Sequence, residues 1–208
     1  MSRDPAAART ALLDAGAWFA DLVEEIRPHH WTRPGLGAWD VRALVGHTHR
    51  ALVTLGTYLT VPADDETCTG TAQYYALSAA ATDPAEVEAR GVAAGRELGR
   101  HPSATVRASL DRARDALAQV PVDEDPLIRT LVGGTRLSAY VPTRTFELAV
   151  HGLDVAGACG LDRRPPEHVL ADAGRTALEL AAHGGHLPGV LLALTGRRPL
   201  PPGFSVLG

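Results

Sequence analysis

Four charged or titratable residues recur at helical spacing in segment 143–158, and three of them can bind metals or transfer protons. Arg144, Glu147, His151 and Asp154 are separated by three, four and three positions. On an α-helix their side chains therefore form one column. The residues between them are mostly apolar, and a polar column on an apolar helix must face water, other polar groups or a metal ion. The segment predicts a helix that carries chemistry on one face.

Glu147 and His151 can reach one point in space, because residues four apart are neighbours on a helix. Zinc accepts both imidazole nitrogen and carboxylate oxygen, but two ligands do not complete a site. The candidate third ligand is His47, which lies at the edge of the apolar stripe of the helix expected after Asp40. His49 faces away from it. On spacing alone, a surface pair of Glu147 and His151 is the alternative interpretation.

Asp154 and Arg144, the polar neighbours of Glu147 and His151, each have alternative roles. Asp154 could accept a hydrogen bond from the second nitrogen of a ligand histidine, or it could be a solvated carboxylate at a helix end. Arg144 could hold a substrate carboxylate, or pair with Glu147 or Asp154. Arg136 and Tyr140 precede the helix and could line the mouth of the site, where a cofactor binds.

The composition excludes several function classes. The chain has 208 residues, a net charge of −4 and a pI of about 6.1, which argues against a nucleic-acid partner. All 20 cationic residues are arginine. Without lysine, a P-loop, a Schiff-base enzyme and a protein kinase are excluded. Two cysteines without a CxxC motif indicate a reducing, cytoplasmic location, and no signal peptide or membrane-spanning run is expected.

Hydrophobic periodicity predicts a mostly helical chain. Asp40 is a good N-cap for a helix that ends by Pro62, and Trp39 could pack on its first turn. Ser103 is a plausible cap after a break near His101. The expected helices cover 4–27, 41–61, 85–119, 143–158, 166–183 and 187–195.

The remaining segments are a loop and a hairpin. Segment 63–84 is polar and reads as irregular, whereas 127–141 predicts a β-hairpin with its turn at Gly133–Gly134. The fold class is therefore an all-α up-down four-helix bundle with long connections, a small β-hairpin before the last bundle helix and short C-terminal helices. We expect one domain overall, with the bundle in 1–160 and a helical extension packed on it in 161–208.

Three stretches resemble a known family. WDVRALVGHTHR (39–50) is similar to a Trp-x-Val-x-x-Leu-x-x-His motif, and PTRTFELAVHGLDVAGACG (142–160) to Arg-x-x-Glu-x-x-x-His-x-x-Asp-x-x-x-Ala. VLLALTGRRPLPPGFSVLG (190–208) is similar to the closing segment of actinobacterial members. These motifs are those of the DinB-like superfamily, in particular the mycothiol-dependent maleylpyruvate isomerase N-terminal domain family.

The resemblance implies a metal site and a thiol cosubstrate. The family's His, Glu, His ligands fall on His47, Glu147 and His151, with zinc, or another divalent ion such as nickel, as the metal. Mycothiol would be the thiol, and a metal-activated thiolate would attack a small electrophile in an S-transferase or cis–trans isomerase reaction. The alternatives are a hydrolase that uses zinc-bound water and a non-catalytic bundle that binds a small molecule.

One departure from the family concerns the substrate. The isomerase carries an additional C-terminal domain, whereas fewer than fifty residues follow Gly160 here. Maleylpyruvate itself is therefore a doubtful substrate. The expected partners are a small thiol and an electrophile, without nucleic acid or membrane, and the protein is expected to be a monomer or a homodimer.

Overall fold

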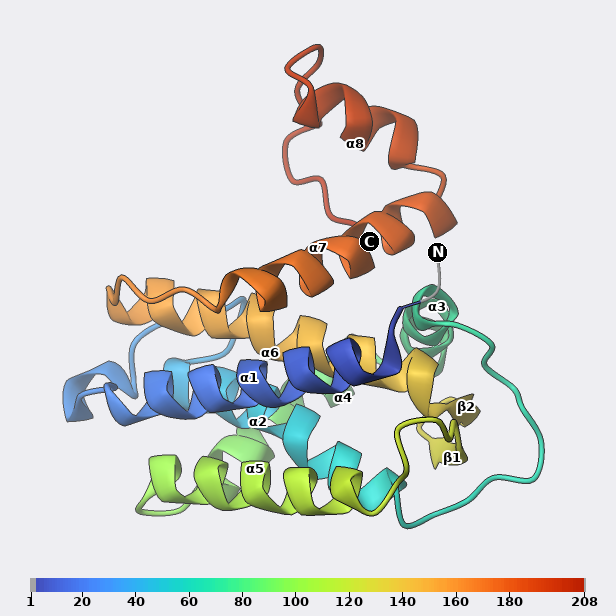
Figure 1. Cartoon of the computed structure of the whole chain (residues 1–208). Coiled ribbons are helices and arrows are strands. Elements are labelled where there is room, and N and C mark those ends of the chain that lie inside the picture. Colours follow the sequence, from blue (N-terminus) through green and yellow to red (C-terminus); the bar gives the residue numbers. More distant parts are fainter. Residues whose placement is uncertain (1–2, 208) are drawn as a thin grey trace.

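Four helices form the central bundle of the computed structural model, which describes residues 3–207. Helices α1 and α2 each pack against both α5 and α6 (Figure 1). The four helices span Pro5–Glu24 (α1), Val41–Tyr58 (α2), Pro102–Ala118 (α5) and Leu137–Cys159 (α6). The arrangement confirms the expected all-α bundle. Along 3–207, no helix is both long and apolar enough to cross a membrane.

Capping and core packing explain where the bundle helices begin. The Asp4 side chain accepts a hydrogen bond from the Ala7 amide, and Asp40 accepts one from the Ala43 amide, so each satisfies an amide of the first turn. The apolar stripes of the helices meet in a single core. Its fully buried side chains include Leu12, Phe19, Leu44, Leu52, Leu110 and Leu148.

Two further helices pack on the outside of the bundle, α3 (Thr71–Ala81) against α6 and α4 (Pro84–Glu97) against α2. Helix α4 lies so close to α2 that a Cβ on Gly46 would be 2.1 Å from the backbone nitrogen of Gly95. The break near His101 is confirmed, but the expected Ser103 cap is wrong, because α5 begins at Pro102 without a side-chain cap. The expected irregular stretch 63–84 was wrong over α3, whose sequence has no stripe of large apolar residues.

The hairpin is present but its turn lies elsewhere. Strands β1 (Leu127–Thr130) and β2 (Gly133–Arg136) are antiparallel, with Thr130 opposite Gly133. Residues 131–132 therefore make the turn. Gly134 instead makes room for a neighbouring loop, since a Cβ there would lie 2.0 Å from the backbone oxygen of Asp65.

Helix α6 starts earlier than the expected position 143. It follows β2 directly at Leu137 and contains Pro142 in its second turn. A proline there removes the amide that would bond to the Ser138 carbonyl, and the helix nevertheless continues through it to Cys159. Tyr140 therefore belongs to α6 and not to the hairpin.

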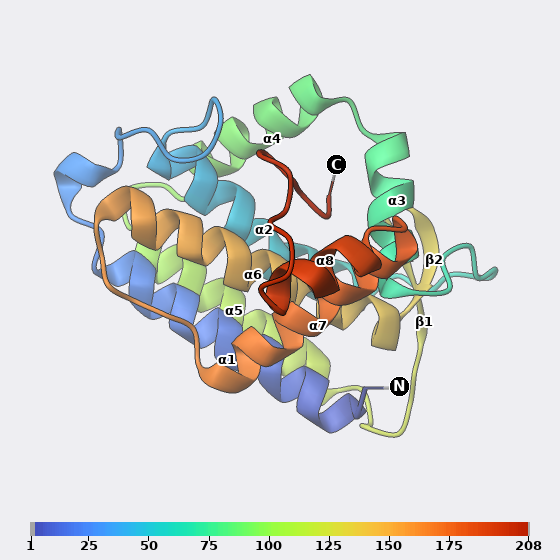
Figure 2. The ribbon, with the colours of Figure 1, turned by 90° about the horizontal axis from the view of Figure 1, so that it is seen from above.

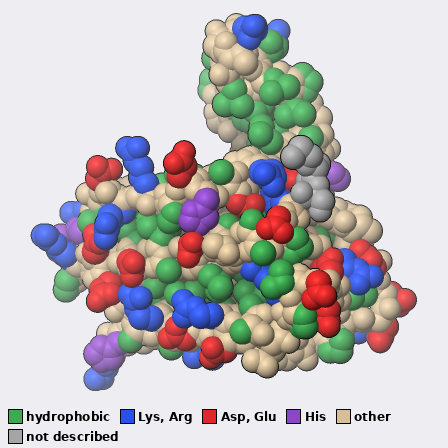
Figure 3. Space-filling model, viewed as in Figure 1, with side chains coloured by type: hydrophobic (Ala, Val, Ile, Leu, Met, Phe, Trp, Pro, Cys, Tyr) green, Lys and Arg blue, Asp and Glu red, His purple; other side chains and the backbone are tan. Residues whose placement is uncertain are grey.

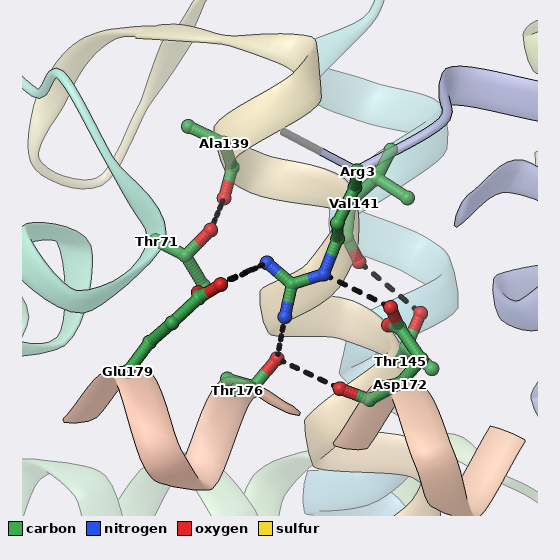
Figure 4. Close-up of polar contacts among 8 residues, drawn as sticks. All are labelled: Arg3, Thr71, Ala139, Val141, Thr145, Asp172, Thr176 and Glu179. Carbon is green, nitrogen blue, oxygen red and sulfur yellow. Dashed lines mark hydrogen bonds and ion pairs between the residues drawn. The ribbon is translucent and has the colours of Figure 1, made fainter. Parts of the chain in front are cut away.

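The C-terminal part adds helices α7 (Glu167–His183) and α8 (Leu187–Leu194). Helix α7 packs on α6, α1 and α3. Arg3 binds it through Asp172 at 2.9 Å, Thr176 at 2.7 Å and Glu179 at 2.9 Å (Figure 4). These contacts hold the start of the described chain against α7. The outermost residues of the expected ranges 1–160 and 161–208, namely 1–2 and 208, lie outside the described chain.

Helix α8 projects away from the bundle, and the chain after it folds back. Hydrophobic side chains cover much of the projecting helix (Figure 3), where Leu194 is 71% exposed. The following segment runs back over α6 towards the gap between α3 and α4 (Figure 2). Phe204 packs edge-on against His186, and Val206 packs against the core. The last described residues thus lie between α3 and α4 (Figure 2).

Candidate metal centre

Three potential metal ligands converge between α2 and α6. His47 comes from α2, and Glu147 and His151 come from α6, which packs against it. Nε2 of His47 lies 3.6 Å from Oε2 of Glu147, and Nε2 of His151 lies 3.4 Å from the same oxygen. All three ligand atoms lie within 4.8 Å of one another. The helix pairing therefore brings together the residues that the sequence predicted.

The three side chains fit a divalent metal ion. Zinc binds nitrogen and oxygen at about 2.0–2.2 Å, so neighbouring ligand atoms of a tetrahedral site lie about 3.3–3.6 Å apart. The two measured nitrogen–oxygen separations fall at this spacing. Two histidines and one carboxylate leave a coordination position free, as in catalytic rather than structural zinc sites.

Two outer residues hold the ligands in orientation. Oδ2 of Asp154 lies 3.1 Å from Nδ1 of His151, which leaves Nε2 of His151 to face Glu147. The hydroxyl of Tyr75, on α3, donates to Oε1 of Glu147 at 2.9 Å. Each contact occupies the atom of the ligand residue that points away from the convergence point, which is how outer partners orient metal ligands.

Trp39 supports the site from the α4 side. Its ring lies 4.5 Å from the ring of His47, and its Nε1 donates to the backbone oxygen of Glu88 on α4. These two contacts were not expected from the sequence. Through them Trp39 links α4 to His47 and restricts the orientation of the imidazole.

The charges of the site are mutually stabilising. Burial alone raises the pKa of Glu147, but hydrogen bonds from His151 and His47 and the positive charges of His151 and Arg144 outweigh it and hold this pKa well below its usual range. Burial alone lowers the pKa of His151, but hydrogen bonds to Asp154 and Glu147 and their charges raise it to about 9. In the absence of metal, His151 is therefore a cation between two carboxylates.

The ligands open onto a cavity of about 890 Å³. This volume lies within the range of sites for small molecules. Its wall includes the three ligands together with Arg144, Tyr140 and residues from α3, α4, the end of α7 and the C-terminal segment. A small-molecule substrate can thus reach the free coordination position from the cavity.

Arg144 lies in this wall with unused hydrogen-bonding capacity. Its guanidinium carbon lies 4.8 Å from the ring centroid of Tyr140 and 5.5 Å from that of Tyr74. Its Nε donates to Thr143 Oγ1 at 2.9 Å, and along residues 3–207 its terminal nitrogens have no hydrogen-bond acceptor. It forms no ion pair with Glu147 or Asp154 within that range. Two aromatic rings therefore hold a cation that lacks a carboxylate partner.

The structure brings most of the predicted site residues together. His47, Glu147, His151, Arg144 and Tyr140 line the cavity, and Asp154 contacts the centre through His151. Tyr140 is fully buried, and its hydroxyl donates to Thr54.

Arg136 is not part of this assembly. It points to Glu66 at 3.1 Å and to the backbone oxygen of Asp125, away from the cavity wall. Tyr75, which contacts Glu147, was not predicted as a site residue from the sequence. The only signal in the sequence is its place in an aromatic pair with Tyr74 within an alanine-rich segment.

The fold and the site together define a helical-bundle protein with a candidate divalent-metal centre between two helices. The family model described as mycothiol maleylpyruvate isomerase N-terminal domain matches residues 12–156, more than half of the chain, and the chain belongs to this family. No curated protein matches the chain, and no solved structure does. The matched range contains all three ligand residues and ends before α7.

Proposed function

We propose that the protein is a metal-dependent enzyme that uses mycothiol as cosubstrate in an S-transfer or cis–trans isomerisation reaction on a small electrophile. The observation that carries this proposal is the convergence of His47, Glu147 and His151 at a cavity. Membership of the mycothiol maleylpyruvate isomerase N-terminal domain family supports the thiol as cosubstrate.

The three ligands would hold the ion, and their outer partners would keep them in place. A bound zinc or nickel ion supplies a Lewis acid that lowers the pKa of a thiol, so that thiolate is available near neutral pH. Asp154 keeps the Nδ1 proton on His151 and its Nε2 lone pair free. Tyr75 keeps Oε2 of Glu147 available by occupying Oε1.

Arg144 would bind an anionic group of the electrophile. Its terminal nitrogens lack an acceptor in the described chain and it lines the cavity. The guanidinium offers a planar pair of donors that matches a carboxylate. Tyr140 and Tyr74 restrict the guanidinium through their rings. Because the chain has no lysine, arginine is the side chain that can supply a positive charge at every physiological pH.

The bond changes define the two possible products. The thiolate sulfur attacks an electrophilic carbon, so that a carbon–sulfur bond forms and the electron pair of the double bond moves onto the conjugated acceptor group. If the adduct rotates about the resulting single bond and expels the thiolate, the double bond returns with the other geometry. If the adduct instead takes up a proton at carbon, the product is a stable S-conjugate.

A titration of cobalt(II)-loaded protein with mycothiol tests the proposal. We expect a saturable sulfur-to-cobalt charge-transfer absorption with mycothiol and none with S-methylated mycothiol, which cannot supply a thiolate. Cobalt that binds without any such absorption would contradict the use of a thiol and would favour hydrolysis by metal-bound water. Failure of the protein to bind cobalt would contradict both.

A further inference from the structure

Three exposed leucines surround the mouth of the cavity. Leu36 is 40% exposed, Leu131 is 51% exposed and Leu207 is 47% exposed, and all three line the cavity that holds the candidate metal centre. They come from three separate segments, namely the loop before α2, the turn of the hairpin and the C-terminal segment. Single exposed leucines are ordinary on protein surfaces, but a group of them around one cavity indicates a binding surface.

The C-terminal segment takes part in this rim through side chains. Val206 lines the cavity beside Leu207 and packs against the core. The backbone hydrogen bonds of residues 199–207 stay within the segment, as in the bond from the Phe204 amide to the oxygen of Pro201. The segment is therefore positioned over the cavity by apolar contacts, and a ligand that reaches it meets apolar surface.

We propose that the substrate is amphiphilic, with an apolar alkyl or aryl group that covers this leucine rim while its acidic group and reactive carbon lie deeper in the cavity. The proposal rests on the proposed function, since it assigns the outer part of the same substrate. The rim and the metal ligands share one cavity, and Arg144 supplies the cation in its wall. Leu36, Leu131 and Leu207 are then specificity-determining residues, and the C-terminal segment helps to select the substrate.

Two probes separate this inference from the proposed function. The first is a series of n-alkanethiols from two to eight carbons, titrated into cobalt(II)-loaded protein and followed by charge-transfer absorption. The second is the fluorescent dye 8-anilino-1-naphthalenesulfonate, an apolar aromatic anion, titrated into metal-free protein. The variants are Leu36→Asp, Leu131→Asp and Leu207→Asp, singly and combined. Leu194→Asp is the matched control, because Leu194 is exposed on α8 and does not line the cavity.

In the wild type, we expect the thiol dissociation constant to fall with chain length, by up to about fourfold for each methylene that leaves water at the rim. The combined rim variant should lose this dependence but keep the affinity for ethanethiol. The dye should bind the combined variant at least about tenfold more weakly than the Leu194→Asp control, because an aspartate at each position replaces apolar contact with a like charge.

The results of the two titrations distinguish failure of this inference from failure of the proposed function. If thiols bind but their affinity does not depend on chain length, or depends on it equally in the rim variants, the inference is wrong while the proposed function stands. If no alkanethiol produces the absorption, the dye alone tests the inference, and the proposed function fails only if mycothiol also produces none. Equal dye affinity in the combined variant and the Leu194→Asp control would then overturn the inference that the three leucines bind an apolar group. Weaker dye binding in the combined variant alone would support it.

Discussion

Replacing Tyr75 by phenylalanine removes a single hydroxyl that contacts the candidate metal centre. This hydroxyl donates to Oε1 of Glu147 at 2.9 Å, in a site where the Glu147 side chain is 17% exposed. A hydrogen bond to a charged group contributes about 1.5–3 kcal/mol, and loss of an outer partner of a metal ligand lowers metal affinity about 10–100-fold. Both ranges apply here because the freed carboxylate loses its orientation as well as its buried partner.

We therefore expect Tyr75→Phe to weaken zinc binding about 10–100-fold, measured by competition with a fluorescent chelator of known affinity. Tyr74→Phe is the matched control, since it removes the same atom from the preceding residue of α3, and within residues 3–207 the Tyr74 hydroxyl has no hydrogen-bond partner. Unchanged affinity in Tyr75→Phe, or an equal loss in Tyr74→Phe, would refute the role of this hydroxyl.

The structure also predicts the direction of change in zinc affinity with pH, in stability with pH and in stability after removal of Arg3. The pKa of His151 is raised to about 9 without metal, so zinc affinity should rise up to about tenfold per pH unit between pH 7 and about 9. The protons released on zinc binding are measured by calorimetry in buffers of different ionisation enthalpy. A zinc affinity that does not change with pH would contradict this prediction. Burial, helped by nearby arginines, lowers the pKa of His49 to about 4, so the unfolded chain binds a proton that the folded chain does not, and stability should fall as the pH drops from about 6.5 to about 4. His49→Gln should reduce that slope by up to about 1.4 kcal/mol per pH unit in urea titrations, and an unchanged slope would rule out His49 as its source. Arg3→Met should lower the free energy of unfolding by about 2–3 kcal/mol, since it leaves the largely buried carboxylate of Asp172 without its cation. The control Arg164→Met removes an exposed arginine and should change this free energy little. Equal effects of the two substitutions would show that the contacts of Arg3 do not stabilise α7.

The amphipathic helices were predictable because their apolar stripes and caps are local signals. Asp40 caps α2 as its position before the stripe predicts. Helix α3 could not be found in this way, since its few large side chains, Tyr74, Tyr75 and Leu77, form no periodic stripe among the alanines. The turn of the hairpin was misplaced because Gly133 and Gly134 serve contacts with residues 65–67, which are remote in the sequence.

The candidate site divides in the same manner. Glu147 and His151 are linked by helical spacing, and His47 was a candidate from its place at the edge of an apolar stripe, which the family resemblance then supported. The contact of Tyr75 with Glu147 depends on how α3 packs against α6, which no local pattern specifies. The exclusion of Arg136 from the cavity has a similar cause, because its direction is set by the pairing with Glu66 across a loop.

The most direct test of the central claim is the metal content of protein purified without an affinity tag from zinc-supplemented cells, measured by mass spectrometry of the elements. We expect about one zinc or other divalent ion per chain in the wild type, and loss of this metal in His47→Ala and His151→Ala. His183→Ala should retain it, because His183 lines the same cavity but lies outside the ligand group. Metal-free wild-type protein, or full metal content in the His47 and His151 variants, would contradict the claim.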